Sequence, residues 1–486
     1  MPTTLASIQT SYIELEKQAP LTGVFSGYKD IIENLFRLLK HPAEDRASSS
    51  IQAPTASVTL TKGQQRALSL ALEGHNLFIT GGGGVGKSFV TNKIIEELRR
   101  KEKSVLVCAS TGKAAQIIGG VTCHRAFRIP IGMTWAKEPK VGKADVVTNS
   151  DVILIDEISM LRLDAFEYIC RSIEQADMLR AEEGNSPIQL IVVGDFAQLP
   201  PVIREEERTL MELEYSFDIG GGYAFKAPSW PKCNFTVCEL TEVLRQSDAD
   251  TVEALRALRF GDSSRLSFFR QHAAHTIPRH PVYLCGKNRT ADYINRCEMN
   301  KLPGRSVLFR SKSVGEVKSC DKQAPDSIWL KIGARVILLT NSENWHNGST
   351  GVIKEIDKDS FSVTVTLDEN NADVSVSYVT WSINSYEIEK IGNSGKKKIK
   401  QVEVGQFTAL PLRLGYAITI HRSQGQTYDE AVLVAGKDCQ EIFSYGQLYV
   451  ALSRCKSTAS LYINGNIEKT KYLTSPEVTG FYNMAG

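Results

Sequence analysis

The chain has 486 residues, of which 42% are hydrophobic and 23% are charged, close to the composition of an average soluble globular protein. This composition excludes a mainly disordered, collagenous or disulfide-scaffold chain, and no apolar run reaches the roughly 18–20 residues that a membrane span needs. The 57 lysines and arginines nearly balance the 55 aspartates and glutamates, so nucleic-acid binding would require positive charge concentrated in a groove.

The N-terminal sequence and the cysteines indicate the cellular compartment of the protein. The chain begins with no basic head followed by an apolar stretch, and with no Arg-rich amphipathic pattern, so we expect neither a signal nor a transit peptide. The 10 cysteines show no pairing pattern, which favours a reducing environment. We therefore expect an intracellular protein with no membrane partner, in the cytoplasm or nucleoid of a prokaryotic or viral host, or in the nucleus of a eukaryote.

Residues 1–57 have the pattern of an N-terminal appendage, with helical spacing at 31–40 followed by a linker rich in Ala, Ser and Pro. From residue 58 short β-rich apolar runs alternate with helix-length stretches. This alternation predicts a parallel sheet covered by helices, an α/β domain over 58–250. Its predicted strands are 76–80, 104–110, 152–157, 188–195 and 236–242.

A second α/β domain is predicted from 251–342 and 406–486. Between these parts, residues 343–405 alternate apolar and polar residues at period two, with turn signals between the runs. We interpret this segment as a small antiparallel β-barrel inserted into the second domain. The predicted strands of the second α/β domain are 282–286, 334–341, 431–435 and 461–463.

The sequence GGGGVGKS at 81–88 matches a phosphate-binding loop, directly after a predicted strand and at the start of a predicted helix. Glycines let the backbone curl so that its N–H groups face a phosphate at the positive end of a helix dipole. Lys87 can then reach the β and γ phosphates, and Ser88 can ligate magnesium. The predicted nucleotide-binding residues are Gly81, Gly82, Gly83, Gly84, Val85, Gly86, Lys87 and Ser88.

The run VILIDE at 152–157 supplies two acids at the carboxyl end of a buried strand, where α/β sheets hold ligands. We expect Asp156 to hold magnesium with Ser88, and Glu157 to orient and activate the attacking water. The predicted cofactors are therefore ATP and Mg²⁺, and hydrolysis of ATP is the leading hypothesis.

A phosphate loop alone is compatible with kinases, switches, transporters and motors, and further motifs narrow the choice. Over about 58–465 the chain resembles superfamily-one helicases of the RecD-like branch, most closely the PIF-type (petite integration frequency) DNA helicases. The matching motifs, in the family order, are LTKGQ at 60–64, ASTGKAA at 109–115, GGVTCHRAF at 119–127, DEISML at 156–161, GDFAQLPPV at 194–202, LTEVLRQ at 240–246, LRLGYAITIHRSQGQT at 412–427 and GQLYVALSRCKS at 446–457.

The resemblance implies two RecA-like parallel-sheet lobes, with the inserted segment as an SH3-like barrel. It implies that Gln64 reads the adenine edge, that Gln198 senses the γ phosphate and that Gly425 contributes to the nucleotide site. Arg245 and Arg454, the latter as arginine finger, would approach the phosphates from opposite sides of a cleft between the lobes. The implied catalytic residues are Lys87, Glu157, Gln198, Arg245 and Arg454.

The resemblance also implies a surface for single-stranded DNA that crosses both lobes. Hydroxyls and backbone N–H groups suit phosphates, while Phe127 or a histidine ring could stack a base, at about 1–3 kcal/mol per stacked base. Core packing is the alternative for Phe127. The candidate residues are Ser110, Thr111, Lys113, Thr122, His124, Arg125 and Phe127 from the first lobe, and His421, Ser423 and Gln426 from the second.

Four segments bear on accessory roles. Residues 128–150, with Trp135, lie where the family places a wedge that splits the duplex, although an ordinary surface loop explains their composition nearly as well. The basic turn at 395–400 could touch phosphate or keep a sheet edge soluble. The segment 161–189 is longer than the family pattern, and residues 1–57 offer a place for replication or repair proteins to bind.

The predicted function is an ATP-dependent DNA helicase that moves five-prime to three-prime on single-stranded DNA and unwinds tailed or forked duplex. The resemblance extends this to G-quadruplexes and RNA–DNA hybrids, and to replication, repair, recombination and telomere maintenance. Two alternatives stay open: a RecD-like motor subunit of a recombination or conjugation complex, and a nucleotide-dependent DNA-binding switch without unwinding. A switch does not need two phosphate-facing arginines, which weighs against the second.

Overall fold

The computed structural model describes residues 60–485, apart from 131–133, 135–136, 243–247, 279–280, 346, 359 and 392–395. The predicted appendage, Trp135, Arg245 and part of the basic turn therefore lie outside the described residues. The structural unit described below starts at Leu60. Within the described ranges, no helix combines the length and apolar character that crossing a membrane takes.

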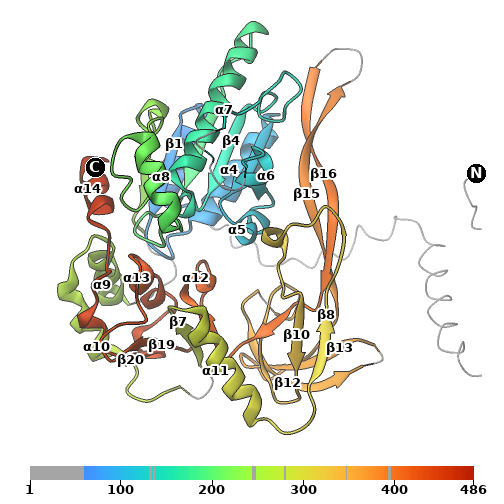
Figure 1. Ribbon diagram of the computed structural model, residues 1–486, viewed down its shortest axis with the longest axis vertical. Helices are drawn as coiled ribbons and strands as arrows, with labels where there is room; N and C mark the ends of the chain where they lie inside the picture. Colours follow the sequence, from blue (N-terminus) through green and yellow to red (C-terminus); the bar gives the residue numbers. More distant parts are fainter. Residues whose placement is uncertain are drawn as a thin grey trace, which may run out of the picture. The chain divides into compact units, whose positions relative to one another are not determined.

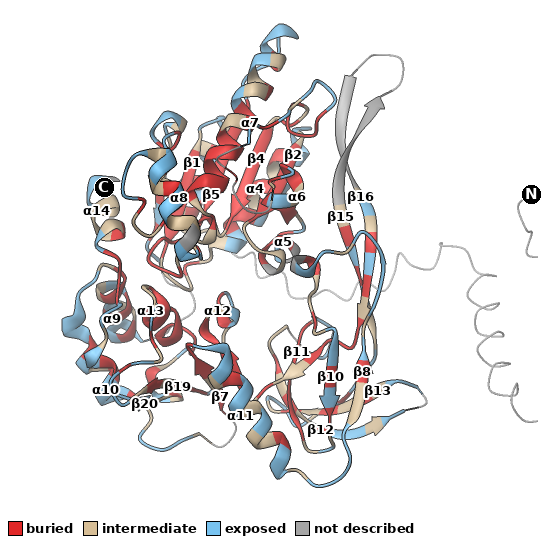
Figure 2. Ribbon diagram, in the orientation of Figure 1, coloured by how far each residue is buried: buried red, intermediate tan, exposed pale blue. Residues whose placement is uncertain are grey.

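The first lobe is built on a six-stranded sheet in the order β3-β2-β4-β5-β1-β6, and every neighbouring pair is parallel (Figure 1). All five strands predicted from the apolar runs are confirmed. The residues of β1, β2, β4 and β5 are buried throughout, as parallel strands covered on both faces require (Figure 2). The strands are β1 (Leu77–Gly81), β2 (Val105–Ala109), β3 (Val121–Thr122), β4 (Val152–Asp156), β5 (Gln189–Val193) and β6 (Thr236–Leu240).

Alternate residues of these strands feed two separate hydrophobic cores. Leu77 and Ile79 of β1 join the core beneath α3 and α4, whereas Phe78 between them joins the core beneath α7. The period-two alternation therefore places helices on both faces and leaves the carboxyl ends of the strands free for the site. The helices of this lobe are α3 (Lys62–Leu72), α4 (Lys87–Arg100), α5 (Gly112–Ile117), α6 (Cys123–Ala126), α7 (Leu163–Glu182) and α8 (Glu205–Tyr215).

The second lobe has a four-stranded parallel sheet in the order β18-β7-β19-β20, which confirms the strands predicted at 282–286, 431–435 and 461–463. These strands are β7 (Val282–Cys285), β18 (Ala417–Thr419), β19 (Ala431–Gly436) and β20 (Leu461–Gly465), and the helices are α9 (Ala249–Arg259), α10 (Leu266–His272), α11 (Asn288–Lys301), α12 (Ile420–Ser423), α13 (Gln447–Leu452) and α14 (Pro476–Ala485).

The strand predicted at 334–341 does not join this parallel sheet, and that assignment was wrong. Strand β11 (Arg335–Leu338) pairs antiparallel with β12 and β17 at the interior of a five-stranded sheet. All four of its residues are buried. A short apolar run buried on both faces has the same pattern in either kind of sheet, so the sequence could not separate the two.

The antiparallel strands run from residue 307 to residue 414, more widely than the predicted insertion at 343–405. They form a five-stranded sheet ordered β14-β13-β12-β11-β17, a pair β10-β8 and a three-stranded sheet β15-β16-β9. The first two sheets share one hydrophobic core. The strands are β8 (Val307–Arg310), β9 (Lys312–Gly315), β10 (Ser327–Leu330), β12 (Thr350–Asp357), β13 (Ser362–Leu367), β14 (Asp373–Val376), β15 (Val379–Ile391), β16 (Lys396–Ala409) and β17 (Leu412–Leu414).

The C-terminal helix α14 follows the last strand of the second lobe but packs on the first lobe. The Phe481 ring stacks on Phe225 at a centroid distance of 4.4 Å and contacts Phe196 edge-on at 5.5 Å. Both partners belong to the first lobe: Phe196 is buried in the core, and Phe225 is partly buried and packs against it. The chain therefore crosses the seam between the lobes a second time at its C-terminal end.

Candidate nucleotide site and strand-binding surface

The phosphate loop joins the end of β1 to the start of α4, as the sequence predicted. Gly81 has φ +146°, and a Cβ atom there would overlap the carbonyl oxygen of Leu240 on the neighbouring strand. Gly86 caps α4 in the left-handed conformation, and Lys87 is the first helical residue. The loop N–H groups thus gather at the positive end of a 14-residue helix, an arrangement that suits a phosphate.

Lys87 lies among the charged groups of the site. Its Nζ donates to the carbonyl oxygens of Gly81 and Gly82, at 2.8 and 2.9 Å. Burial lowers the pKa of Lys87, while the carboxylates of Asp195 and Glu157 raise it in part. The ammonium group is therefore poorly solvated and surrounded by acids, a setting in which a polyphosphate would be a strong partner.

Gln64 is hydrogen-bonded to the backbone of the phosphate loop. The side chain is fully buried, its Nε2 donates to the carbonyl oxygen of Val85 at 3.2 Å, and its Oε1 accepts from the backbone N–H of Thr61. Gln64 and Thr61 form a capping box at the start of α3, which fixes the position of the Gln64 side chain. Through its bond to Val85, this side chain then holds the phosphate loop. That Gln64 reads the adenine edge stays a prediction.

The acidic pair lies at the end of β4. Burial, and then the charge of Glu157, raise the pKa of Asp156 to about 7, and burial also raises the pKa of Glu157. Glu157 adopts a left-handed backbone with φ +53°, which is uncommon for a non-glycine residue and frequent at functional sites. The buried carboxylate of Asp156, the half-buried carboxylate of Glu157 and the exposed hydroxyl of Ser88 are hard oxygen donors, so the chemistry of these residues fits Mg²⁺.

Glu157 is also contacted from the second lobe. Gln424 Nε2 donates to Glu157 Oε2 at 3.0 Å, and this bond lowers the pKa of Glu157 against the larger effect of burial. Ser110 Oγ donates to the backbone oxygen of Glu157 at 2.7 Å. Ser110 was predicted to contact DNA, and in this structure its hydroxyl is bonded to the backbone of Glu157.

Asp195 is the centre of a buried network that the sequence did not reveal. Its Oδ1 accepts from Arg259 Nε at 3.0 Å and from the Tyr482 hydroxyl at 3.1 Å. The same hydroxyl contacts Thr80 Oγ1 at 2.9 Å, immediately before the phosphate loop. Tyr449 of α13 bonds the N–H of Gly83 at 3.0 Å.

This network could not be found from local patterns. Arg259, Tyr449 and Tyr482 come from three segments of the second half of the chain, and Asp195 follows β5 of the first lobe. Asp195 and Tyr449 lie inside quoted motifs, which was the only available signal. Arg259 and Tyr482 had none, because a Tyr or Arg in an amphipathic helix is usually a surface residue.

The motif that contains Gln198 meets the second lobe directly. Gln198 is nearly buried, and a Cβ atom on Gly446, which has φ +73°, would overlap the Gln198 carbonyl oxygen. The backbones of the two lobes are therefore in close contact here. The predicted role of Gln198 as a γ-phosphate sensor is untested, but its motif stands at the seam.

Arg454 lies against the phosphate loop. Its side chain is 2% exposed, and its Nη2 is 3.8 Å from the position of a Cβ atom on Gly83. Nη1 donates to the backbone oxygens of Ser423 and Gln426 at 3.0 and 3.1 Å. The guanidinium is therefore held by the motif that also contains Gly425, and it acts on the pKa of Glu157. Arg245, predicted on the opposite side, lies outside the described residues.

A cavity of about 270 Å³ joins Glu157, the predicted hydrolytic acid, to part of the predicted strand surface. Thr111, His421 and Gln426 line it together with Glu157 and Gln424, and Gly425 also lies on its wall. Burial lowers the pKa of His421, so the ring is neutral near pH 7 and can stack or accept a hydrogen bond.

Other predicted strand contacts have different places. Phe127 is 5% exposed and belongs to the core of the first lobe, so the prediction that its ring stacks on a base was wrong. The fully buried Ser423 hydroxyl donates to the carbonyl oxygen of Ile420, which removes it as a phosphate contact. Thr122 caps α6 by accepting from the N–H of Arg125. A buried aromatic and a helix-capping hydroxyl satisfy local packing first.

Arg125 links the first lobe to the antiparallel strands. Its Nη2 forms an ion pair with Asp321 at 2.7 Å and its Nη1 donates to the carbonyl oxygen of Asn384 at 3.5 Å. His124 is exposed beside it. Lys113 is in α5, but its side chain lies outside the described residues. Strand contact by Arg125 would require exchange of Asp321 for a phosphate.

The comparisons with known proteins agree with this site. The family model of PIF1-like helicases matches residues 59–262, and that of the UvrD-like helicase C-terminal domain matches residues 414–462. The chain is 31% identical to the ATP-dependent DNA helicase Pif1 of Campylobacter jejuni over 438 residues, which cover 84% of this chain and 91% of that protein. PIF1 of Xenopus laevis is longer: the match, 31% identical over 457 residues, spans 64% of it.

The solved structures give the same result. The complex of Bacteroides sp Pif1 with ADP-AlF4 matches with a TM-score of 0.73 and 26% identity over 88% of this chain and 97% of that one. Bacteroides Pif1 bound to single-stranded DNA matches with a TM-score of 0.61 and 27% identity over 88% and 97% of the two chains. With the phosphate loop, the acidic pair and Arg454 at one seam, these similarities show that the chain belongs to the PIF1-like family of ATP-dependent DNA helicases.

Proposed function

We propose that this protein hydrolyses magnesium-ATP between its two lobes and uses that reaction to move five-prime to three-prime along single-stranded DNA, unwinding tailed or forked duplexes. One observation carries the proposal. The cavity of about 270 Å³ is lined by the hydrolytic acid Glu157 and by Thr111, His421 and Gln426, so the predicted strand surface and the nucleotide site share a wall. Strand binding and hydrolysis can therefore influence each other through direct contacts.

The residues divide the chemistry as follows. Lys87 and Arg454 neutralise charge that spreads over the transferring phosphoryl group, from the first and second lobe respectively. Glu157 accepts a proton from the attacking water, and its raised pKa makes it a stronger base than an ordinary glutamate. Mg²⁺, held by Ser88 and Asp156, would polarise the phosphate oxygens. Gln424 orients the Glu157 carboxylate from the second lobe.

Hydrolysis removes the γ phosphate, the anionic group that Lys87 and Arg454 would bind together at the seam between the lobes. While a γ phosphate is present, Arg454 and Lys87 have a common anionic partner, and this favours a closed seam. After its release, that attraction is lost and the lobes separate. Because α12 carries both His421 and the backbone that fixes Arg454, the movement is transmitted to the strand-lining residues.

A directional unwinding assay tests the function. Duplexes with only a five-prime tail, only a three-prime tail or both are incubated with magnesium-ATP, with Lys87→Ala as the inactive control. We expect opening of the five-prime-tailed and forked substrates. Opening of three-prime-tailed substrates alone would overturn the polarity. Related solved structures show Bacteroides Pif1 bound to single-stranded DNA and Pif1 helicases at forked double-stranded DNA, which supports the choice of substrates.

The wider role is part of the same proposal. Unwinding of G-quadruplexes and RNA–DNA hybrids, and action in DNA replication, repair, recombination or telomere maintenance inside the cell, rest on the family resemblance. Residues 1–57 would recruit replication or repair proteins. A RecD-like motor subunit is the second candidate, and co-purification with a nuclease or relaxase would favour it. A switch without unwinding would show ATP turnover that single strands scarcely stimulate.

A further inference from the structure

Two arginines outside the predicted contacts stand where two cavities meet. Arg413 of β17 and Arg422 of α12 line the cavity of about 270 Å³ that holds His421 and Gln426. Both also line a second cavity of about 450 Å³, bounded by α11, β10, β17 and β18. None of the predicted strand or nucleotide residues lines the second cavity. The arginines therefore mark the point where the predicted strand path would continue.

The electrostatics at this junction favour an anion. Burial, and then the like charge of Arg422, lower the pKa of Arg413 to about 10, so the Arg413 guanidinium remains charged at neutral pH and is repelled by Arg422. Around the second cavity the cationic residues Arg296, Lys331, Arg413 and Arg422 face one carboxylate, Asp292. A phosphate placed between the guanidinium groups would remove the repulsion and gain charge-assisted hydrogen bonds.

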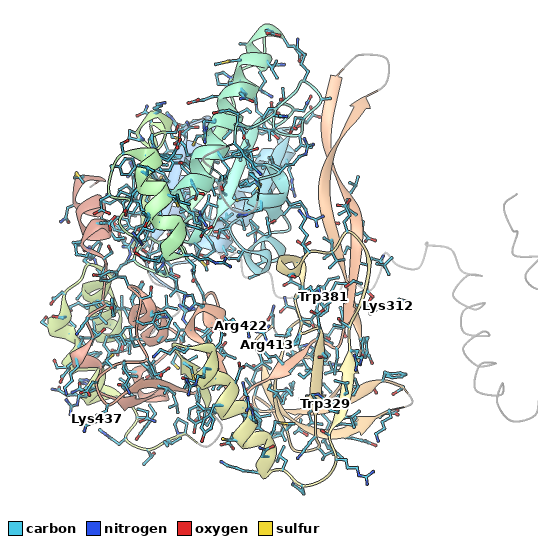
Figure 3. All side chains as sticks on the ribbon, in the orientation of Figure 1. Lys312, Trp329, Trp381, Arg413, Arg422 and Lys437 are labelled. Carbon is cyan, nitrogen blue, oxygen red and sulfur yellow. The ribbon has the colours of Figure 1, made fainter. Side chains whose placement is uncertain are left out.

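An aromatic side chain completes the surface. Trp329 of β10 lines the second cavity and is 55% exposed, whereas its neighbours Ile328 and Leu330 face the core of the antiparallel strands. In Figure 3 the side chains of Arg413 and Arg422 lie next to each other between α12 and the antiparallel strands, and Trp329 lies beyond them. Cationic groups beside an exposed aromatic ring are the combination that binds single-stranded nucleic acid.

We propose that Arg413, Arg422 and Trp329 form a further subsite for single-stranded DNA, in which the two arginines hold one backbone phosphate and Trp329 stacks on a base. The occupant is a strand rather than a free nucleotide, because the site is continuous with the cavity of His421 and Gln426 and has no residue of the phosphate loop in its lining. This inference rests on the proposed function, since it needs a strand in the first cavity.

The test measures binding of an oligothymidylate by fluorescence anisotropy at several salt concentrations, with full-length protein. Each phosphate contact contributes about −0.7 to the slope of log K against log salt for a single strand, so Arg413→Gln should make the slope shallower by about 0.7. The control is Lys437→Gln, which removes an exposed charge of the second lobe remote from these arginines (Figure 3) and should keep the wild-type slope. A wild-type slope in Arg413→Gln would overturn the phosphate contact.

Trp329 is tested by its own emission. Three other tryptophans are described: Trp230 and Trp381 are 9% and 7% exposed, and Trp345 is half-buried. Quenching that is lost in Trp329→Phe is therefore assigned to Trp329. Trp329→Phe should keep most of the affinity and lose most of the quenching, whereas Trp329→Ala should weaken binding about tenfold. Equal quenching in wild type and Trp329→Phe would refute stacking even if Trp329→Ala is poorly folded. If the wild type itself binds no single strand, the proposed function fails rather than this subsite alone.

Discussion

Gln424 Nε2 lies 3.0 Å from Glu157 Oε2 and donates a hydrogen bond to it across the seam between the lobes. Gln424 belongs to the segment that also carries His421 and Gln426, two predicted strand contacts, and Glu157 is the predicted acceptor of the water proton. In the proposed function, this hydrogen bond would join strand binding and hydrolysis by a single side chain. Substitution of Gln424 can therefore test whether strand binding and hydrolysis are coupled through this bond.

Gln424→Ala should reduce stimulation of the ATPase by single strands, because Glu157 loses the group that orients its carboxylate from the second lobe. The hydrogen bond lowers the pKa of Glu157, so its loss should raise that pKa and shift the acid limb of the kcat–pH profile to higher pH. Steady-state ATPase rates with and without oligothymidylate, from pH 5.5 to 9, measure both effects. Gln271→Ala, at an exposed position of α10, is the control and should behave as wild type. An unshifted acid limb in Gln424→Ala would contradict the coupling.

Tyr482→Phe removes the hydroxyl that contacts Asp195 and Thr80 beside the phosphate loop. We expect a loss of about 1–2 kcal/mol in the free energy of unfolding, since buried polar groups lose a partner. We also expect a several-fold fall in kcat, because Asp195 and the loop are less well fixed. Denaturant unfolding and ATPase kinetics provide the measurements. Tyr472→Phe, at an exposed ring just before α14, is the matched control. If both variants had the same free energy of unfolding and the same kcat, the Tyr482 hydroxyl of α14 would have no role in the site.

The parallel sheets show how far the sequence could predict this structure. Five apolar runs of the first lobe and three of the second became parallel strands, because short β-rich runs between helix-length segments have few other solutions. Arg335–Leu338 was misplaced because a doubly buried strand has the same pattern in an antiparallel sheet. Motif position identified Lys87, Asp156 and Arg454 at the seam. It failed for Phe127 and Ser423, since a motif does not show which of its side chains turns into the core.

Asp156→Asn should stabilise the protein in the absence of magnesium at pH 8. The pKa of Asp156 in the folded chain, about 7, is above that of an exposed carboxyl, so the folded state binds the proton more tightly than the unfolded state. The stability due to this proton is present at low pH and is lost as pH rises toward and through 7. Thermal unfolding in a chelator from pH 5 to 8 should therefore show wild type losing stability relative to Asp156→Asn.

Magnesium should raise the thermal stability of the wild type but not that of Asp156→Asn, because the cation stabilises the charged carboxylate that the asparagine lacks. The concentration of magnesium that restores stability should rise as pH falls below about 7, since the proton competes for Asp156. Asp151→Asn, with a carboxylate that bonds Ser104 and Arg180 away from the loop, is the control. Equal magnesium responses in Asp156→Asn and wild type would refute Asp156 as a ligand.

In the proposed function, ATP is hydrolysed at the seam where Arg454 of the second lobe lies against the phosphate loop of the first. The most direct measurement is single-turnover ATP hydrolysis on saturating oligothymidylate by Arg454→Lys, with nucleotide affinity determined separately. Lysine keeps the charge but loses the guanidinium fork, so we expect hydrolysis to fall about 100-fold or more while nucleotide binding changes little. Hydrolysis at the wild-type rate by a variant that binds nucleotide and DNA normally would contradict the claim.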